Sequence, residues 1–63
     1  MQSNPVITVN LSTSQAWAFA QFLKRVGLSD YKALAASMEE AYNMLEAGDT
    51  IRTELRMAGY DPR

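Results

Sequence analysis

Hydrophobic and polar residues alternate with a period of two near the N-terminal end of the chain. Within residues 6–11 this alternation follows the order Ile7, Thr8, Val9, Asn10 and Leu11. A short alternating segment that is rich in β-branched residues is typical of a β-strand with one apolar face. The rest of the chain has no comparable segment, so the sequence predicts a single strand.

The hydrophobic period changes to that of a helix after this segment. Ser12 and Gln15 stand in the spacing of a capping box, in which each side chain satisfies a backbone amide of the other residue. They predict a helix from about residue 13 to residue 26. Gly27 is expected to stop it, because glycine freely adopts the left-handed conformation that ends helices. At about 100° per residue, the expected core face holds Ala16, Phe19, Phe22, Leu23 and Val26.

A short helix and a long helix are predicted for the remainder. Ser29 or Asp30 caps the short helix, which extends through about Ala35. The long helix begins at a second capping box, formed by Ser37 and Glu40, runs to residue 58 and stops at the glycine that follows.

The long helix has an apolar stripe with a glycine inside it. Gly48 in mid-helix lowers helix stability by up to ~1 kcal/mol relative to alanine. It predicts that another backbone packs closely there, or that the helix bends or breaks, and the sequence leaves this choice open. The expected stripe holds Ala41, Met44, Gly48, Ile51, Leu55 and Ala58.

Some apolar side chains are expected outside these core faces. Trp17 lies on the far side of the first helix, and Met38, Tyr42 and Leu45 follow a second stripe of the long helix. In one interpretation the short helix and the C-terminal tail cover them. In the other they form an interface, where Trp, Tyr and Met are enriched.

These elements predict one domain over residues 1–63, mainly α with one N-terminal strand, in the order β-α-α-α. A single strand exposes its hydrogen-bonding groups, and a core this small is marginal without disulfides or metal. We therefore expect the strand to pair across a homodimer. The candidate residues for the dimer or partner interface are Ile7, Val9, Trp17, Met38, Tyr42 and Leu45.

The composition argues against catalysis and bound metals. The chain has neither His nor Cys, which are the commonest general base and metal ligands. Its carboxylates do not form a catalytic pattern, because even Glu46 and Asp49, three residues apart, have no third partner. No nucleophile elbow or phosphate-binding loop occurs. We expect no enzyme activity, no cofactor and no metal.

The charge balance bears on partners and location. The net charge is −1 and the pI is about 5.1, whereas sequence-independent nucleic-acid binders carry a basic excess. Lys24 and Arg25 are the basic candidates for a nucleic-acid contact, and they are also well placed to complement a helix C-terminus. The sequence has no secretory signal and no membrane-spanning apolar run, so a cytoplasmic protein without a membrane partner is expected.

The alternating segment 7–11, followed by a capped helix that ends at Gly27, resembles the ribbon-helix-helix DNA-binding family over about residues 5–27. The resemblance implies a strand paired with its twin, with outward side chains in the major groove. It makes Val6, Thr8 and Asn10 the outward positions, and Thr and Asn can hydrogen-bond base edges. The chain departs from the family because its strand has no Lys or Arg and residues 28–58 exceed the usual second helix.

Other segments carry a second resemblance, to a small, poorly characterised family of bacterial plasmids, phages and integrated elements. They are Gln15-Ala16-Trp17, the run from Gln21 to Gly27, Glu40-Ala41-Tyr42 and Ala58-Gly59-Tyr60. This resemblance implies no activity and carries no functional residues over. Short acidic proteins from such elements include anti-CRISPR inhibitors, which block host complexes by covering a surface, so the analogy is one of context and size.

We therefore expect a non-enzymatic interaction protein, a mobile-element-encoded inhibitor or regulator that binds a host protein complex. The alternative is a DNA-binding transcriptional repressor of the ribbon-helix-helix type. A protein partner supports the first expectation and operator DNA supports the second. The absence of positive charge on the outward strand positions favours the protein partner.

Overall fold

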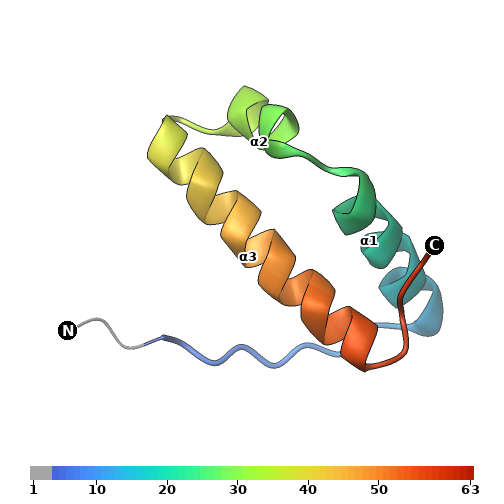
Figure 1. The fold of residues 1–63 in the computed structure, drawn as a ribbon. Coiled ribbons are helices and arrows are strands. Elements are labelled where there is room, and N and C mark those ends of the chain that lie inside the picture. Colours follow the sequence, from blue (N-terminus) through green and yellow to red (C-terminus); the bar gives the residue numbers. More distant parts are fainter. Residues whose placement is uncertain (1–3) are drawn as a thin grey trace.

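A computed structural model describes residues 4–63 of the chain. Its helices are α1 (Thr13–Arg25), α2 (Leu28–Leu34) and α3 (Met38–Met57). The α1 and α3 helices pack against each other, and α2 joins them at one end (Figure 1). Residues 4–11 form an extended segment, here called the arm, which passes α3 near its C-terminal half.

The prediction of a strand over residues 6–11 is not met within one chain, because residues 4–63 contain no strand. The residues of the arm have no backbone hydrogen-bond partner in this part of the chain. A strand exists only where a neighbouring segment accepts and donates its backbone hydrogen bonds, and α1 and α3 use theirs internally. The fold is therefore all-α over the described residues, with the arm extended beside it.

The predicted start of α1 is confirmed, but the predicted role of Gly27 is wrong. The Gln15 amide donates to Ser12 Oγ over 3.1 Å and the Ser12 amide donates to Gln15 Oε1 over 2.9 Å. Gly27 is not left-handed, with φ −123° and ψ 177°, and it is the N-cap of α2. Its amide donates to Asp30 Oδ2 over 2.8 Å, so Asp30 completes the cap from inside the helix rather than starting it.

The predicted bounds of α3 are confirmed at both ends. The Glu40 amide donates to Ser37 Oγ over 3.1 Å. The second hydrogen bond of the predicted capping box differs, because the Glu40 carboxylate accepts the amide of Ala36 over 3.4 Å, rather than that of Ser37. At the other end Gly59 adopts a left-handed φ of 103°, and the Tyr60 amide donates to the Leu55 carbonyl over 2.8 Å. This reversal directs the C-terminal tail back along the helices.

The α3 helix is continuous through Gly48, which settles the choice left open by the sequence. Gly48 is buried, and the neighbour that packs closely against it is the Tyr31 side chain of α2 rather than another backbone. A Cβ atom at position 48 would overlap the Tyr31 hydroxyl. The glycine therefore lets α2 lie against α3.

The core is built mainly from small residues. It consists of Ala16, Ala20, Leu23, Ala41 and Leu55, with Val26 and Tyr60 packed against its larger cluster. The prediction that Phe19 and Phe22 lie in the core is wrong, because these side chains are 40% and 50% exposed. Ile51 and Ala58 of the predicted α3 stripe are also exposed.

The error on α1 is a rotation of the buried face. Ala16, Ala20 and Leu23 are buried, and their centre lies roughly 60° around the helix from the predicted face at 100° per residue. Alanines at the contact allow two helix backbones to approach closely, whereas phenylalanines there would hold them apart.

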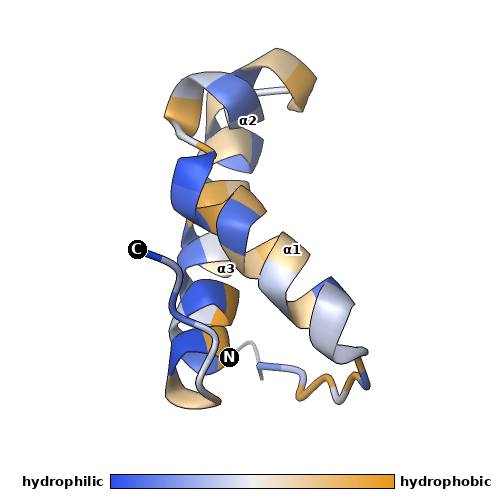
Figure 2. Ribbon diagram, turned by 90° about the vertical axis from the view of Figure 1, so that its right-hand side faces the viewer, coloured by the Kyte–Doolittle hydropathy of each residue, from blue (hydrophilic) through white to orange (hydrophobic). Residues whose placement is uncertain are grey.

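The molecule is flat. Its extents are 33 × 29 × 16 Å and its radius of gyration is 12.8 Å. The smallest extent is little more than the diameter of a helix with its side chains, about 10–12 Å. The molecule is thus little more than one layer of helices thick. Figure 2 shows hydrophobic residues on the arm as well as along the helices.

Candidate functional site

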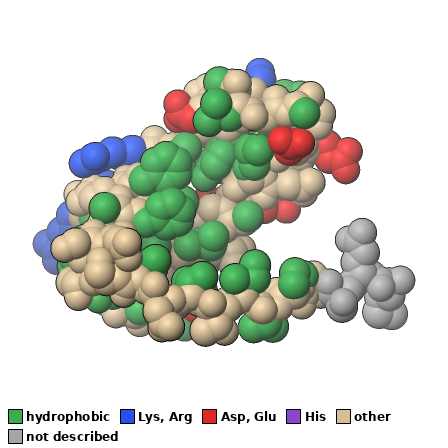
Figure 3. Space-filling model, turned by 180° about the vertical axis from the view of Figure 1, so that it is seen from behind, with side chains coloured by type: hydrophobic (Ala, Val, Ile, Leu, Met, Phe, Trp, Pro, Cys, Tyr) green, Lys and Arg blue, Asp and Glu red, His purple; other side chains and the backbone are tan. Residues whose placement is uncertain are grey.

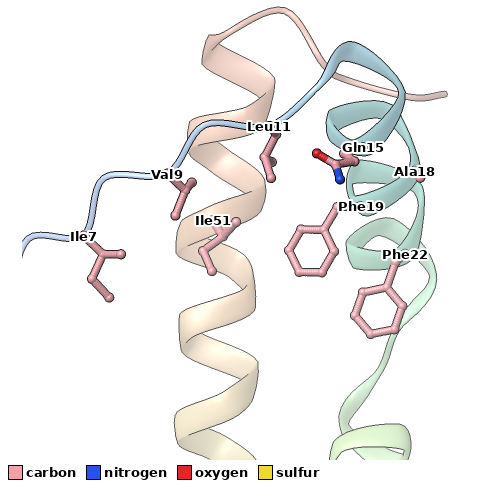
Figure 4. A pocket seen from close by; sticks show the side chains of 8 residues that line it. All are labelled: Ile7, Val9, Leu11, Gln15, Ala18, Phe19, Phe22 and Ile51. Atoms are coloured by element: carbon pink, nitrogen blue, oxygen red, sulfur yellow. The ribbon is translucent and has the colours of Figure 1, made fainter.

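The main candidate site is an open apolar groove of about 760 Å³ between the arm, α1 and α3, here called the arm groove. Figure 4 shows Leu11, Phe19 and Ile51 pointing into the same space from these three elements. The lining residues are Ile7, Val9, Leu11, Gln15, Ala18, Phe19, Phe22 and Ile51.

The arm supplies every second residue to the groove. Ile7, Val9 and Leu11 line it, while Thr8 and Asn10 are exposed and do not. The sequence predicted this division correctly, because alternation along an extended backbone places successive side chains on opposite sides. Ile7 and Val9, two of the expected interface residues, therefore share one apolar face, and their role in an interface stays a prediction.

The helix wall of the groove centres on two aromatic rings. The rings of Phe19 and Phe22 are stacked, with centroids 5.6 Å apart and an interplanar angle of 14°. Aromatic side chains contribute large apolar contact areas and dominate the energetics of many interfaces. Two neighbouring phenylalanines left half in water are therefore the strongest docking feature of this face.

The described residues that line the groove include no charged side chain. Their polar member, Gln15, uses its carbonyl oxygen for the Ser12 cap. Figure 3 looks onto this side of the molecule, where hydrophobic side chains gather in the middle and along the arm and charged ones lie toward the margins. Such a surface offers nothing to a phosphate group and suits an apolar partner surface.

Trp17 is not part of the groove. Its ring meets the Tyr60 ring edge-on, with centroids 5.1 Å apart and an interplanar angle of 75°. The C-terminal tail thus partly covers Trp17, as one of the two interpretations expected.

The remaining interface candidates lie on α3. Met38 and Tyr42 are exposed and Leu45 is half-buried. They do not line the arm groove. The structure therefore divides the predicted interface residues between the groove, the tail contact and a separate stripe of α3.

The four candidate residues for a nucleic-acid contact lie at opposite ends of α1. Thr8 and Asn10 lie on the arm before α1, whereas Lys24 and Arg25 form the last turn of that helix. The helix between them is about 20 Å long at 1.5 Å per residue. Arg25 lies beside Phe22, Val26 and Asp30 at a second, smaller depression.

The titratable groups of residues 4–63 include an exposed ion pair and a tyrosine whose pKa is shifted. No group of three or more metal-binding side chains occurs among residues 4–63. An ion pair joins Arg56 Nε and Asp61 Oδ1 over 3.8 Å on the exposed surface. Burial raises the pKa of the Tyr31 phenol, and the charges of Asp49 and Asp30 raise it further.

None of the helices among residues 4–63 is long and apolar enough to cross a bilayer.

Sequence reasoning selected two of the eight residues that line the arm groove, Ile7 and Val9, and missed the other six. It assigned Phe19, Phe22 and Ile51 to the core and did not select Ala18 or Leu11 as site residues. The available signal was the pair of alanines at positions 16 and 20, four residues apart, which marks the close helix contact and turns the phenylalanines outward.

Comparison with known proteins gives one match. No curated protein and no solved structure matches the chain. Residues 1–63 match a family of unknown function, DUF7706. Because the match extends over the full length, the chain belongs to the DUF7706 family.

Proposed function

We propose that this chain is a non-enzymatic interaction protein and that the arm groove is its principal protein-binding surface. One observation carries the proposal, namely that arm, α1 and α3 together present a charge-free apolar groove of about 760 Å³. Isolated exposed hydrophobic residues are ordinary, but a contiguous apolar surface shared by three elements is typical of a binding face.

The proposed role is that of an inhibitor or regulator of a host protein complex, carried by a mobile element. A chain with neither His nor Cys, whose described carboxylates form no cluster, is suited to act by occupying a surface. The stacked pair Phe19 and Phe22 would anchor whichever protein chain binds in the arm groove, since aromatic residues contribute disproportionately to binding energy.

Photo-crosslinking in cells tests the proposal. A photoreactive phenylalanine analogue replaces Phe22 in the groove or, as the matched control, Tyr42, since the native side chains are 50% and 48% exposed. We expect adducts to a protein chain from position 22 and few from position 42. Absence of adducts at 22, or equal yields from both positions, would contradict the proposal.

The alternative is a DNA-binding repressor, and one observation favours it. Thr8 and Asn10 face away from the groove on an extended arm, which is the placement that reading of base edges requires. A gel-shift titration at about 0.15 M salt separates the two functions. We expect no sequence-specific shift by the unmodified chain. A specific shift that Thr8→Ala with Asn10→Ala abolishes would replace the protein-binding proposal with this alternative.

A further inference from the structure

The chain exposes more surface than a folded monomer of its mass. Its solvent-accessible surface is 5301 Å², whereas the scaling for compact monomers gives about 4000 Å² at 7.0 kDa. The radius of gyration, 12.8 Å, exceeds the ~11 Å expected of a compact domain of this length. The surface excess of roughly 1300 Å² is larger than the ~800 Å² that each partner contributes to a stable interface.

The excess lies partly on the extended arm, where Val6 and Ile7 are 94% and 78% exposed, and the helices beside it form one layer. Stable domains bury the apolar faces of two packed layers, and here one face of the α1–α3 pair is covered only partly, by the arm. The buried core holds three alanines and two leucines, Ala16, Ala20, Ala41, Leu23 and Leu55. The large apolar side chains Phe19, Phe22 and Ile51 lie outside this core, and no second layer within the described residues covers them.

The arm has an unmet backbone requirement of its own. Its residues are extended, with no backbone partner among residues 4–63, and its apolar side chains lie on one side. An extended segment of this kind is completed by a second extended segment of matching apolar register. The arm of another copy of the chain has that apolar register because its sequence is the same.

The absence of charge in the groove lining permits contact between like surfaces. Two copies of a charged surface would repel, and burying an unpaired charge is strongly unfavourable. Two copies of the arm groove bring together Ile7, Val9, Phe19, Phe22 and Ile51 with no such charge. A second copy is also present wherever the chain is made, so the fold can rely on it.

From these four observations we propose that a second copy of this chain occupies the arm groove. The two arms pair antiparallel across a two-fold axis, and the two apolar faces close on each other as two layers of one core. This inference rests on the proposed function, since it names the partner of the same groove.

Sedimentation analysis of two matched variants tests the proposal. Ile7 lines the groove and Thr8 does not, and both are exposed in the single chain, so an aspartate at either position replaces no buried side chain within the subunit. We expect the unmodified chain and Thr8→Asp to sediment at twice the 7.0 kDa of one chain at micromolar concentration. Ile7→Asp buries a charge at the interface and should weaken the dimer by about tenfold or more. Equal effects of both variants would overturn the proposal.

A single introduced cysteine tests the arm pairing separately, because the chain has none of its own. Thr8→Cys lies near the middle of the arm and should form a disulfide with its twin under mild oxidation, whereas Ser29→Cys on α2 should not. A dimer that cross-links equally from both positions would show that the arms do not pair.

The outcomes also separate this inference from the proposed function. A stably folded 7.0 kDa monomer whose position 22 still cross-links to another protein would overturn the second copy and leave the groove as a binding surface. A monomer without any protein adduct at position 22 would overturn both proposals.

Discussion

At the residue scale, side-chain size determines which positions lie inside. Ala16, Ala20 and Gly48 are buried where helices meet, whereas Phe19 and Phe22 are half-exposed on the neighbouring face of α1. The Tyr31 side chain fills the space above Gly48. The packing of α2 against α3 thus depends on one missing Cβ atom.

Gly48→Ala should therefore destabilise the fold although alanine favours helix. The gain in helix propensity is up to about 1 kcal/mol, but displacement of the Tyr31 hydroxyl opposes it, and overpacking typically costs about 1–3 kcal/mol. Urea unfolding followed by circular dichroism measures the net change. In a Tyr31→Phe background, which lacks the hydroxyl, the same substitution should become neutral or stabilising. An equal effect in both backgrounds would show that the hydroxyl does not determine the contact.

The cap of α1 gives a second prediction at this scale. Ser12→Ala removes the acceptor for the Gln15 amide and should lower the free energy of unfolding by about 1 kcal/mol. Ser14→Ala is the control, because that hydroxyl makes no capping bond in the described structure. Equal losses from the two substitutions would mean that the capping box contributes nothing.

At the element scale, the sequence predicts what local interactions decide. The start of α1 and both ends of α3 follow from Ser12, Ser37 and Gly59, whose caps involve residues within a few positions of each other. The rotation of α1 depends on how closely another helix approaches, so the hydrophobic period alone placed Phe19 inside. Gly27 was misjudged because a second helix begins there, and its cap requires an extended backbone.

The arm marks the limit of prediction from one chain. Its alternation was read correctly, and the side chains that line the groove are the ones that the pattern grouped. Whether an alternating segment becomes a strand depends on a partner, which the local sequence does not specify.

The contact between Tyr60 of the C-terminal tail and Trp17 of α1 can be followed by tryptophan fluorescence. Tyr60→Ala removes the ring that meets Trp17, the single tryptophan. Trp17 emission should shift to longer wavelength because its indole becomes more exposed to water, and stability should fall modestly since Tyr60 packs on the core. Tyr42→Ala, an aromatic substitution on α3, should leave the emission unchanged. An emission shift of equal size from Tyr60→Ala and Tyr42→Ala would show that the Tyr60 ring does not shield Trp17.

At the scale of the whole molecule, folding and association should be coupled. If two thin layers complete one core, the melting temperature rises with protein concentration, because dilution favours separated chains. Thermal unfolding over a hundredfold range of concentration measures this dependence. Ile7→Asp, which weakens the pairing, should melt at a lower temperature at the highest concentration. A melting temperature independent of concentration in the unmodified chain would show that each subunit folds alone.

The arm also sets the fate of a chain that finds no partner. Proteases bind extended backbone, and an exposed extended segment whose backbone makes no hydrogen bond among residues 4–63 is a place where degradation begins. Pairing of two arms would close that backbone and withdraw the entry point, so unassembled subunits would be cleared while assembled ones persist. The amount of protein in the cell would then follow the amount that has assembled, and the lifetime of the chain would depend on whether its arm is paired.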